Sequence, residues 1–278
     1  MKNALLYLCF VLIGTLSCKK DASVWQTDNL NGNTITIFGH GGMGIHSLYP
    51  LDSYESISKC IAMGADGSEM DLQMSKDSVL FVYHSQKLEE ATSCHGVLFD
   101  HLSTDLTCEY TSTVHKNIRV IRFHDLLEKL NISEKNMLTL ECKLNGNSEL
   151  AYLNAFANVL IAQLIEKDLL GKCLIESTNP DFLAILKSKN AKLRLFLYTT
   201  NFEIGLITAK SLNLFGMTFD MFKITKEQIE IAHENNLRIA LFNQKREQDN
   251  VTSLQMNPDF IQTDKLKHLL KIMGKYRN

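Results

Sequence analysis

The sequence predicts an α/β protein that forms a single (β/α)8 TIM barrel. Eight short runs of β-branched or leucine-rich residues alternate with amphipathic helical stretches, a pattern typical of parallel strands joined by helices. These units occupy about 240 residues, a length that favours a closed barrel over an open sheet. No internal repeat or Pro/Gly-rich linker interrupts them, so a second domain has no support.

The eight predicted strands share a β-branched or leucine-rich core. They are Thr34–Gly39, Asp66–Leu72, Met137–Cys142, Cys173–Glu176, Leu193–Tyr198, Leu214–Thr218, Arg238–Phe242 and Asp259–Gln262. Two intervening helices begin with clear signals. Asn179 is an N-cap followed by Pro180, and Thr225 forms a capping box with Gln228.

A ninth extended run, Val79–Tyr83, follows the second strand after a Lys-Asp-Ser turn. We expect a small hairpin-like excursion here instead of a barrel strand. Cys94 and Cys108 lie beyond it. In an exported protein they can close a disulfide in a loop, or both can remain free, and the sequence leaves this open. No cysteine or histidine spacing is typical of a zinc site.

The composition is that of a globular protein. The 278 residues are 45% hydrophobic and 22% charged, which excludes disordered, collagen-like and low-complexity classes. The formal net charge is only -2 and no basic run occurs, so nucleic acid is excluded as a partner. The sequence does not determine the oligomeric state.

The N-terminal residues have the pattern of an export signal. Lys2 precedes the apolar run Ala4–Ile13, which is too short to span a bilayer comfortably. Thr15–Cys18 resembles the lipobox of bacterial lipoproteins, which implies a signal peptide over residues 1–17 and a lipidated Cys18. The alternative is a plain secretory signal.

We expect Cys18 to attach an exported protein to the bacterial cell membrane, the outer one if the cell has two. Residues 18–33 then form a polar, flexible tether, and residues 34–278 form the barrel domain.

Acidic side chains gather on two predicted strands. Glu69 and Asp71 are two residues apart and therefore share one face, and Glu141 and Lys143 repeat this spacing. Three carboxylates without a neighbouring thiol cluster indicate one hard divalent cation, Mg²⁺ or Ca²⁺. The alternative is a salt-bridged layer at the barrel mouth.

Two histidines follow strand ends. His40 ends the first strand in a glycine-rich turn, and His84 ends the Val79–Tyr83 run. Catalytic groups in this fold lie at the carboxyl ends of the strands, so both imidazoles are candidate general acids or bases. The remaining histidines lack such placement and are expected to be solvated or locally hydrogen-bonded.

The order of these motifs resembles the glycerophosphodiester phosphodiesterase family from about Ile37 to Leu266. That family shows HRG, PEN(T/S), GADxxExD, DGxxVxxHD, LxRTT, ExK and TD segments in this order. The corresponding segments here are His40–Gly42, Pro50–Ser53, Gly64–Asp71, Lys76–Ser85, Leu88–Thr92, Glu141–Lys143 and Thr263–Asp264. The ordered set is specific, although each piece alone is weak.

The resemblance implies that Glu69, Asp71 and Glu141 bind the cation, while His40 and His84 exchange protons. It further implies that Lys143 binds a phosphate oxygen. A neighbouring substrate hydroxyl would attack phosphorus, and water would open the resulting cyclic phosphate.

The sequence also departs from the family pattern. Gly41 replaces the Arg of HRG, Leu51 replaces the Glu of PEN, and Ser85 replaces the Asp of HD. Glu89 and Glu90 stand in the Arg neighbourhood of LxRTT. Two phosphate-facing cations are thus missing.

We therefore expect a divergent, lipid-anchored phosphodiester hydrolase with a small-molecule phosphodiester substrate. The alternatives are a non-catalytic lipoprotein that binds a phosphorylated ligand, and a cyclising, phospholipase-like lyase. Tyr198 and Phe242 are candidates for an apolar pocket around the alcohol group, or for barrel packing.

Overall fold

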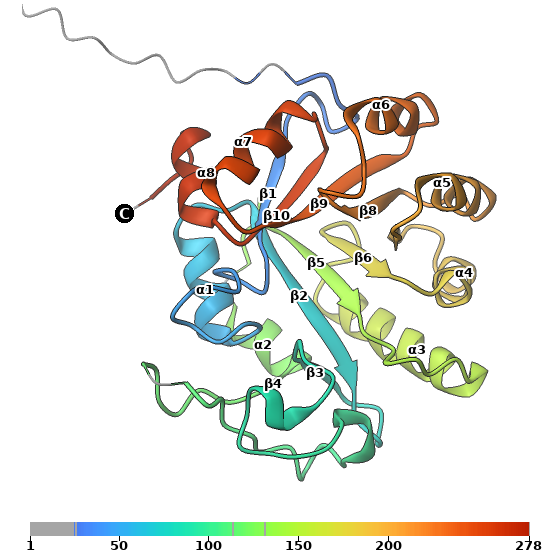
Figure 1. Ribbon diagram of the computed structural model, residues 1–278. Coiled ribbons are helices and arrows are strands. Elements are labelled where there is room, and N and C mark those ends of the chain that lie inside the picture. Colours follow the sequence, from blue (N-terminus) through green and yellow to red (C-terminus); the bar gives the residue numbers. More distant parts are fainter. Residues whose placement is uncertain (1–24, 26, 113, 131, 278) are drawn as a thin grey trace, which may run out of the picture.

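Eight parallel strands close into a barrel in the computed structural model, which describes residues 25, 27–112, 114–130 and 132–277 (Figure 1). The strands are β1 (Thr36–Gly39), β2 (Gly67–Met74), β5 (Met137–Cys142), β6 (Cys173–Ser177), β7 (Arg194–Tyr198), β8 (Gly216–Asp220), β9 (Arg238–Gln244) and β10 (Phe260–Thr263). Each pairs in parallel with its neighbour, and β1 pairs with both β10 and β2. The predicted TIM barrel is confirmed.

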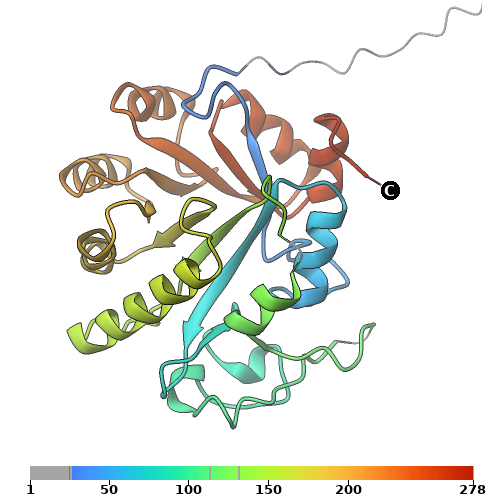
Figure 2. The same cartoon turned by 180° about the vertical axis from the view of Figure 1, so that it is seen from behind.

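The helices cover the outside of the barrel (Figure 2). They are α1 (Tyr54–Ala62), α2 (Phe123–Lys129), α3 (Leu150–Glu166), α4 (Pro180–Lys189), α5 (Phe202–Ser211), α6 (Lys226–Glu234), α7 (Glu247–Gln255) and α8 (Leu266–Ile272). Both predicted helix starts are confirmed. The Asn179 side chain accepts from the Phe182 amide, and Thr225 and Gln228 form the capping box.

Side chains on the inner face of the barrel form an apolar layer with a polar layer above it. Phe38, Phe196 and Phe260 pack with Leu174 and Ala240 in the interior. Residues two positions further along a strand point the same way, one layer closer to the carboxyl ends. Those positions carry His40, Glu176, Tyr198, Phe242 and Gln262, which line one cavity. The two-residue period of the strands thus places the polar side chains directly above the apolar layer.

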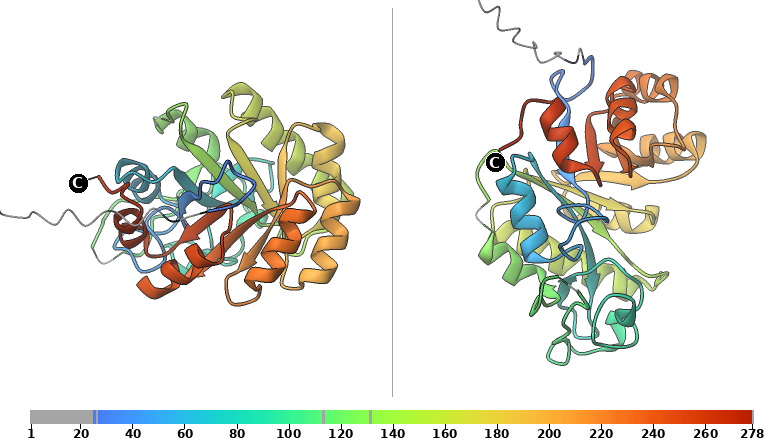
Figure 3. Two further views of the ribbon diagram at one scale, coloured as in Figure 1. Left: turned by 90° about the horizontal axis from the view of Figure 1, so that it is seen from above. Right: turned by 60° about the vertical axis from the view of Figure 1, so that its left-hand side comes forward.

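An excursion over residues 75–122 interrupts the barrel after β2. It contains β3 (Leu80–Val82), antiparallel to β2, and β4 (Ile121–Arg122), antiparallel to β3. Two short 3-10 turns, Leu88–Glu90 and Leu98–Asp100, lie between them. The views in Figures 1 and 3 show this segment beyond the carboxyl end of β2. The hairpin is confirmed, but the excursion is longer than the predicted run.

The excursion has its own small core and a covalent link. Phe81, Leu88, Leu98 and other apolar side chains pack together, separately from the main core. Cys94 and Cys108 form a disulfide, which decides between the two alternatives left open by the sequence. Cys60, Cys142 and Cys173 are buried free thiols.

Residues just before β1 bind the opposite, amino-terminal end of the barrel. Asn29 donates to the Pro258 carbonyl oxygen, the Asp28 amide donates to the Asn257 side chain, and Arg238 donates to the Leu30 carbonyl. This part of the predicted tether packs on the barrel. The predicted signal peptide and Cys18 lie outside the described residues. No helix in the described ranges has the length and apolar character needed to cross a membrane.

Candidate active site

Three carboxylates converge at the carboxyl ends of β2 and β5. The parallel register places Asp71 directly opposite Glu141, and Glu69 lies two residues earlier on β2. One oxygen from each of Glu69, Asp71 and Glu141 lies within 4.8 Å of the others. Asp71 Oδ2 is buried without a hydrogen-bond partner. Buried, converging carboxylate oxygens are the ligands that a hard divalent cation prefers.

The Lys143 ammonium lies beside two of these acids. Its Nζ is 3.1 Å from Asp71 Oδ1 and 2.9 Å from Glu141 Oε1. Burial alone would lower the pKa of Lys143, but the negative charges of Asp71 and Glu141 outweigh it and raise the pKa. The salt-bridged layer considered from the sequence is therefore present, and it includes part of the carboxylate cluster.

Two further acids, which sequence reasoning missed, surround this cluster. Asp52 is fully buried and accepts a hydrogen bond from the Asp71 amide at 3.2 Å. Glu176, on β6, accepts from the Thr218 hydroxyl at 2.8 Å and from the Gln262 amide at 2.7 Å. The signal for Glu176 was its position at the end of a strand, two residues beyond a core position.

The acids outnumber the ammonium groups in the cluster. Burial, reinforced by the charge of Asp71, raises the pKa of Asp52, Glu69 and Glu141. Burial also raises the pKa of Glu176 to about 8. One ammonium from Lys143 cannot balance five carboxyl groups, and the surplus of hard oxygen donors fits a divalent cation.

His40 is fixed by a carboxylate. Its Nδ1 lies 2.8 Å from Asp264 Oδ1, and its Nε2 lies 4.0 Å from Glu69 Oε2. Burial lowers the pKa of His40, but the hydrogen bond and charge of Asp264 outweigh it, and the net shift is upward. The sequence indicated Asp264 only as part of a Thr-Asp motif, and the structure shows that it pairs with His40.

His84 faces His40 across the site. Their ring centroids are 6.4 Å apart, so the structure brings the two predicted imidazoles together. The Gln73 amide donates to the carbonyl oxygens of Tyr83 and Ser85 and so holds the backbone on both sides of His84. Burial lowers the pKa of His84. The pKa of His40 is therefore raised and the pKa of His84 is lowered relative to an ordinary histidine.

Gly41 and Leu51, which both differ from the family pattern, lie next to each other in the structure. Gly41 has φ +50°, and a Cβ built there would lie 2.5 Å from Leu51 Cδ2. A side chain at position 41 is thus incompatible with this position of Leu51. The Gly41 amide instead donates to Glu69 Oε2 at 2.8 Å and helps to orient that carboxylate.

A cavity of about 280 Å³, called here the barrel cavity, lies over the acids. His40, His84, Glu69, Glu141 and Lys143 all line it. Tyr198 and Phe242 line it as well and pack against each other, with ring centroids 5.2 Å apart. The fold and this site define a TIM-barrel protein with a buried acidic cluster and two imidazoles at the carboxyl ends of its strands.

The comparisons with known proteins agree with this class. A model of the "Glycerophosphoryl diester phosphodiesterase family" matches residues 44–268, and the chain belongs to that family. A glycerophosphodiester phosphodiesterase of Caldanaerobacter subterraneus subsp. tengcongensis is 22% identical over 240 residues, covering 81% of this chain and 93% of that protein. The chain matches only 36% of the length of a Bacillus subtilis glycerophosphodiester phosphodiesterase, with 34% identity over 108 residues.

Solved structures show the same fold. A glycerophosphodiester phosphodiesterase from Parabacteroides distasonis superposes with a TM-score of 0.75 at 16% identity, covering 86% of this chain and 97% of that one. An Oleispira antarctica phosphodiesterase, in complex with the product sn-glycerol-3-phosphate, gives a TM-score of 0.75 at 14% identity, covering 86% and 96%.

Proposed function

We propose that the protein is a metal-dependent phosphodiesterase that hydrolyses glycerophosphodiesters, or a closely related phosphodiester, to an alcohol and a phosphomonoester. The convergence of Glu69, Asp71 and Glu141 within 4.8 Å, beside two facing imidazoles, carries the proposal. Membership of the family supports the reaction class. The product complex of the Oleispira antarctica neighbour supports a glycerol phosphate product.

Glu69, Asp71 and Glu141 would hold the single divalent cation, Mg²⁺ or Ca²⁺, which when bound supplies positive charge next to the phosphate oxygens. The buried Asp71 Oδ2, which has no hydrogen-bond partner, supports this assignment. Asp52 and Glu176 border the cluster and add oxygen donors to it, although burial raises the pKa of both carboxyl groups.

The side chains of this protein perform the proton transfers. His40 is oriented through Nδ1 by Asp264, so its Nε2 is directed toward the site. His84 lies on the opposite side. One imidazole takes the proton of a neighbouring substrate hydroxyl as it attacks phosphorus, and the other gives a proton to the departing alkoxide. Water then opens the cyclic phosphate to the phosphomonoester, with the two proton transfers reversed. Lys143, held by Asp71 and Glu141, directs positive charge to a phosphate oxygen.

Turnover of glycerophosphodiesters by the purified protein tests the proposal, with release of free alcohol as the readout. We expect hydrolysis in Ca²⁺ or Mg²⁺, loss of hydrolysis in EDTA, and recovery when the cation is restored. Turnover that continues in EDTA would contradict the role of the metal. Phosphorus NMR distinguishes hydrolysis, which accumulates a phosphomonoester, from cyclising cleavage, which leaves a cyclic phosphate.

A non-catalytic binding protein is the second candidate. The observation that favours it is the pair Gly41 and Leu51, which leaves no room for a side-chain cation at position 41. It predicts saturable binding of a glycerophosphodiester in Ca²⁺ with no product over hours. Detection of product eliminates it.

We also propose that the chain is anchored through a lipid on Cys18, as its lipobox-like segment indicates. Incorporation of labelled palmitate by the full-length protein expressed in bacteria tests this. We expect label in the natural sequence and none after Cys18→Ala. Equal labelling of the two would contradict the proposal.

A further inference from the structure

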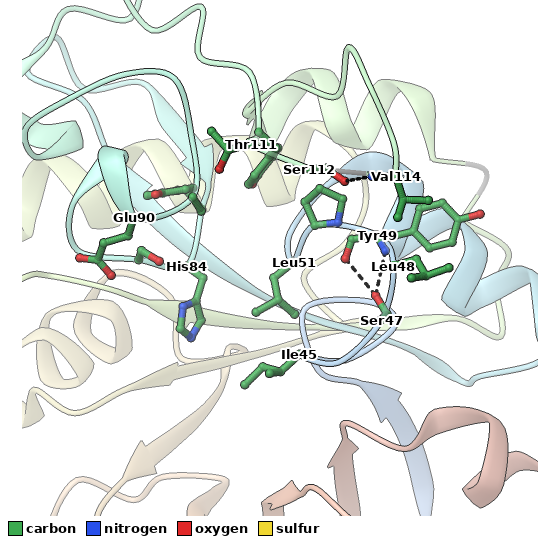
Figure 4. Close-up of a pocket in the computed structure, with 15 residues that line it drawn as sticks. Ile45, Ser47, Leu48, Tyr49, Leu51, His84, Glu90, Thr111, Ser112 and Val114 are labelled. Carbon is green, nitrogen blue, oxygen red and sulfur yellow. Dashed lines mark hydrogen bonds between the residues drawn. The ribbon is translucent and has the colours of Figure 1, made fainter.

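A second cavity of about 400 Å³ opens beside the candidate active site (Figure 4). We call it the side pocket. The loop after β1 forms one wall, with Ile45, Leu48 and Leu51, and the excursion forms the other, with Tyr110 and Val114. We propose that the side pocket binds an apolar alcohol group of the substrate, so that the protein acts on glycerol phosphodiesters of alkyl alcohols. This inference rests on the proposed function.

The side pocket is continuous with the reacting groups. His84 and Ile45 line both the side pocket and the barrel cavity. Figure 4 shows Leu51 and Ile45 next to the His84 ring. A phosphodiester carries two alcohol groups that diverge from one phosphorus atom. A phosphoryl group beside His84 therefore places one alcohol in each cavity.

The two cavities differ in chemistry. The barrel cavity presents Glu176, Asn243 and Gln262, whose polar groups suit the hydroxyls of glycerol. In the side pocket, Ile45, Leu48 and Val114 remain 40%, 66% and 54% exposed. Exposed large apolar side chains gathered around one cavity mark a binding site, because covering them removes apolar surface from water.

The charges of the side pocket disfavour an anionic alcohol group. Among the residues that line it, all of them described, Glu90 and the titratable His84 are the ones that can carry charge. Glu90 Oε1 accepts the Lys87 amide at 3.2 Å, in the capping box of the first 3-10 turn. This hydrogen bond leaves the negative charge of Glu90 in place, so the pocket accepts a neutral or a cationic alcohol group, and its apolar side chains favour one with an alkyl chain.

Hydrolysis of a series of n-alkyl glycerol phosphodiesters, from methyl to octyl, tests the inference. With the full-length protein in Ca²⁺ we expect kcat/KM to rise about fourfold per methylene, the gain for burying one CH2 group. In Leu48→Asp the gain per methylene falls to less than half. Ile207, on α5, is 70% exposed and far from both cavities in sequence and fold, and Ile207→Asp keeps the full gain.

A second comparison needs no variant. 3-Hydroxybutyrate and n-butanol have alkyl chains of similar length, but only the first is anionic, and we expect the butyl ester of glycerol phosphate to react faster. A preference for the anionic ester overturns the inference, as does a kcat/KM independent of chain length.

The Kd of the same alkyl esters for His40→Ala in Ca²⁺ separates this inference from the proposed function. If the natural protein hydrolyses none of the esters but the Kd for His40→Ala falls with chain length, the side pocket inference is supported and the proposed function is contradicted. If Kd does not change with chain length, the side pocket inference fails.

Discussion

The barrel and the excursion obtain rigidity in different ways. The barrel is held by continuous parallel pairing and one large apolar core, and its described part contains no disulfide. The excursion has only two short strands, a small core and the Cys94–Cys108 bond. The barrel carries the acids and His40, whereas the excursion contributes His84 and most of one side-pocket wall. The candidate site therefore combines acids on regular strands with one imidazole from a cross-linked loop.

The largest expected effect concerns the barrel. Glu69→Gln keeps the shape of the side chain but removes one charge from the cation cluster, and we expect kcat to fall about 1000-fold. Circular dichroism and thermal melting should show the fold intact. Glu203→Gln, on the exposed face of α5, is the matched control and should retain activity. If Glu69→Gln retained full activity, the Glu69 carboxylate would have no role in catalysis.

The second effect concerns the excursion. A disulfide closing a loop of this size contributes about 3 kcal/mol. In Cys94→Ser/Cys108→Ser we expect faster amide hydrogen exchange across residues 75–122, with the barrel strands unchanged. Reduction of the natural protein with dithiothreitol should give the same pattern. Faster exchange throughout the barrel would show that the two regions do not unfold separately.

The third effect tests the junction of the two regions. Gly41→Ala introduces a Cβ 2.5 Å from Leu51 Cδ2 at a positive φ, and we expect a loss of about 2 kcal/mol in the free energy of unfolding. Leu51→Ala should remove the steric part, so the double variant loses less than the sum of the single ones. Chemical denaturation measures all three. If the losses in the free energy of unfolding were strictly additive, Gly41 and Leu51 would not interact.

The smallest expected effect is on the pH dependence of stability, which we compare for Glu176 in the barrel and Asp77 in the excursion. Burial raises the pKa of Glu176 to about 8, so its contribution to stability is fully present below its ordinary value and is lost as pH rises toward 8. Denaturation in EDTA should show Glu176→Gln more stable than the natural protein at pH 8 by at least about 1.4 kcal/mol, the equivalent of one pKa unit. The difference should vanish near pH 4.5.

Asp77, in the excursion, supplies the opposite control. Hydrogen bonds from Ser75 and Ser103 lower the pKa of Asp77 to about 2. Its contribution to stability is therefore present above its ordinary value and is lost as pH falls toward 2. Asp77→Asn should destabilise at pH 7 and not at pH 2. The same sign of pH dependence for both variants would contradict these environments.

What the sequence predicted follows this division. The period of two located Glu69, Asp71, Glu141 and Lys143 on common faces, because strand geometry is regular. Asp52 was missed because it precedes α1 at a positive φ, and its burial depends on how that helix packs. The Asp264 contact with His40 joins residues 224 apart. The side pocket depends on loops of the excursion that have no periodic pattern.

Asn29, which binds the Pro258 carbonyl, fixes where the chain joins the barrel: at the end opposite the acids. The described residues ahead of β1 therefore line neither the barrel cavity nor the side pocket, and the entering chain leaves both openings uncovered.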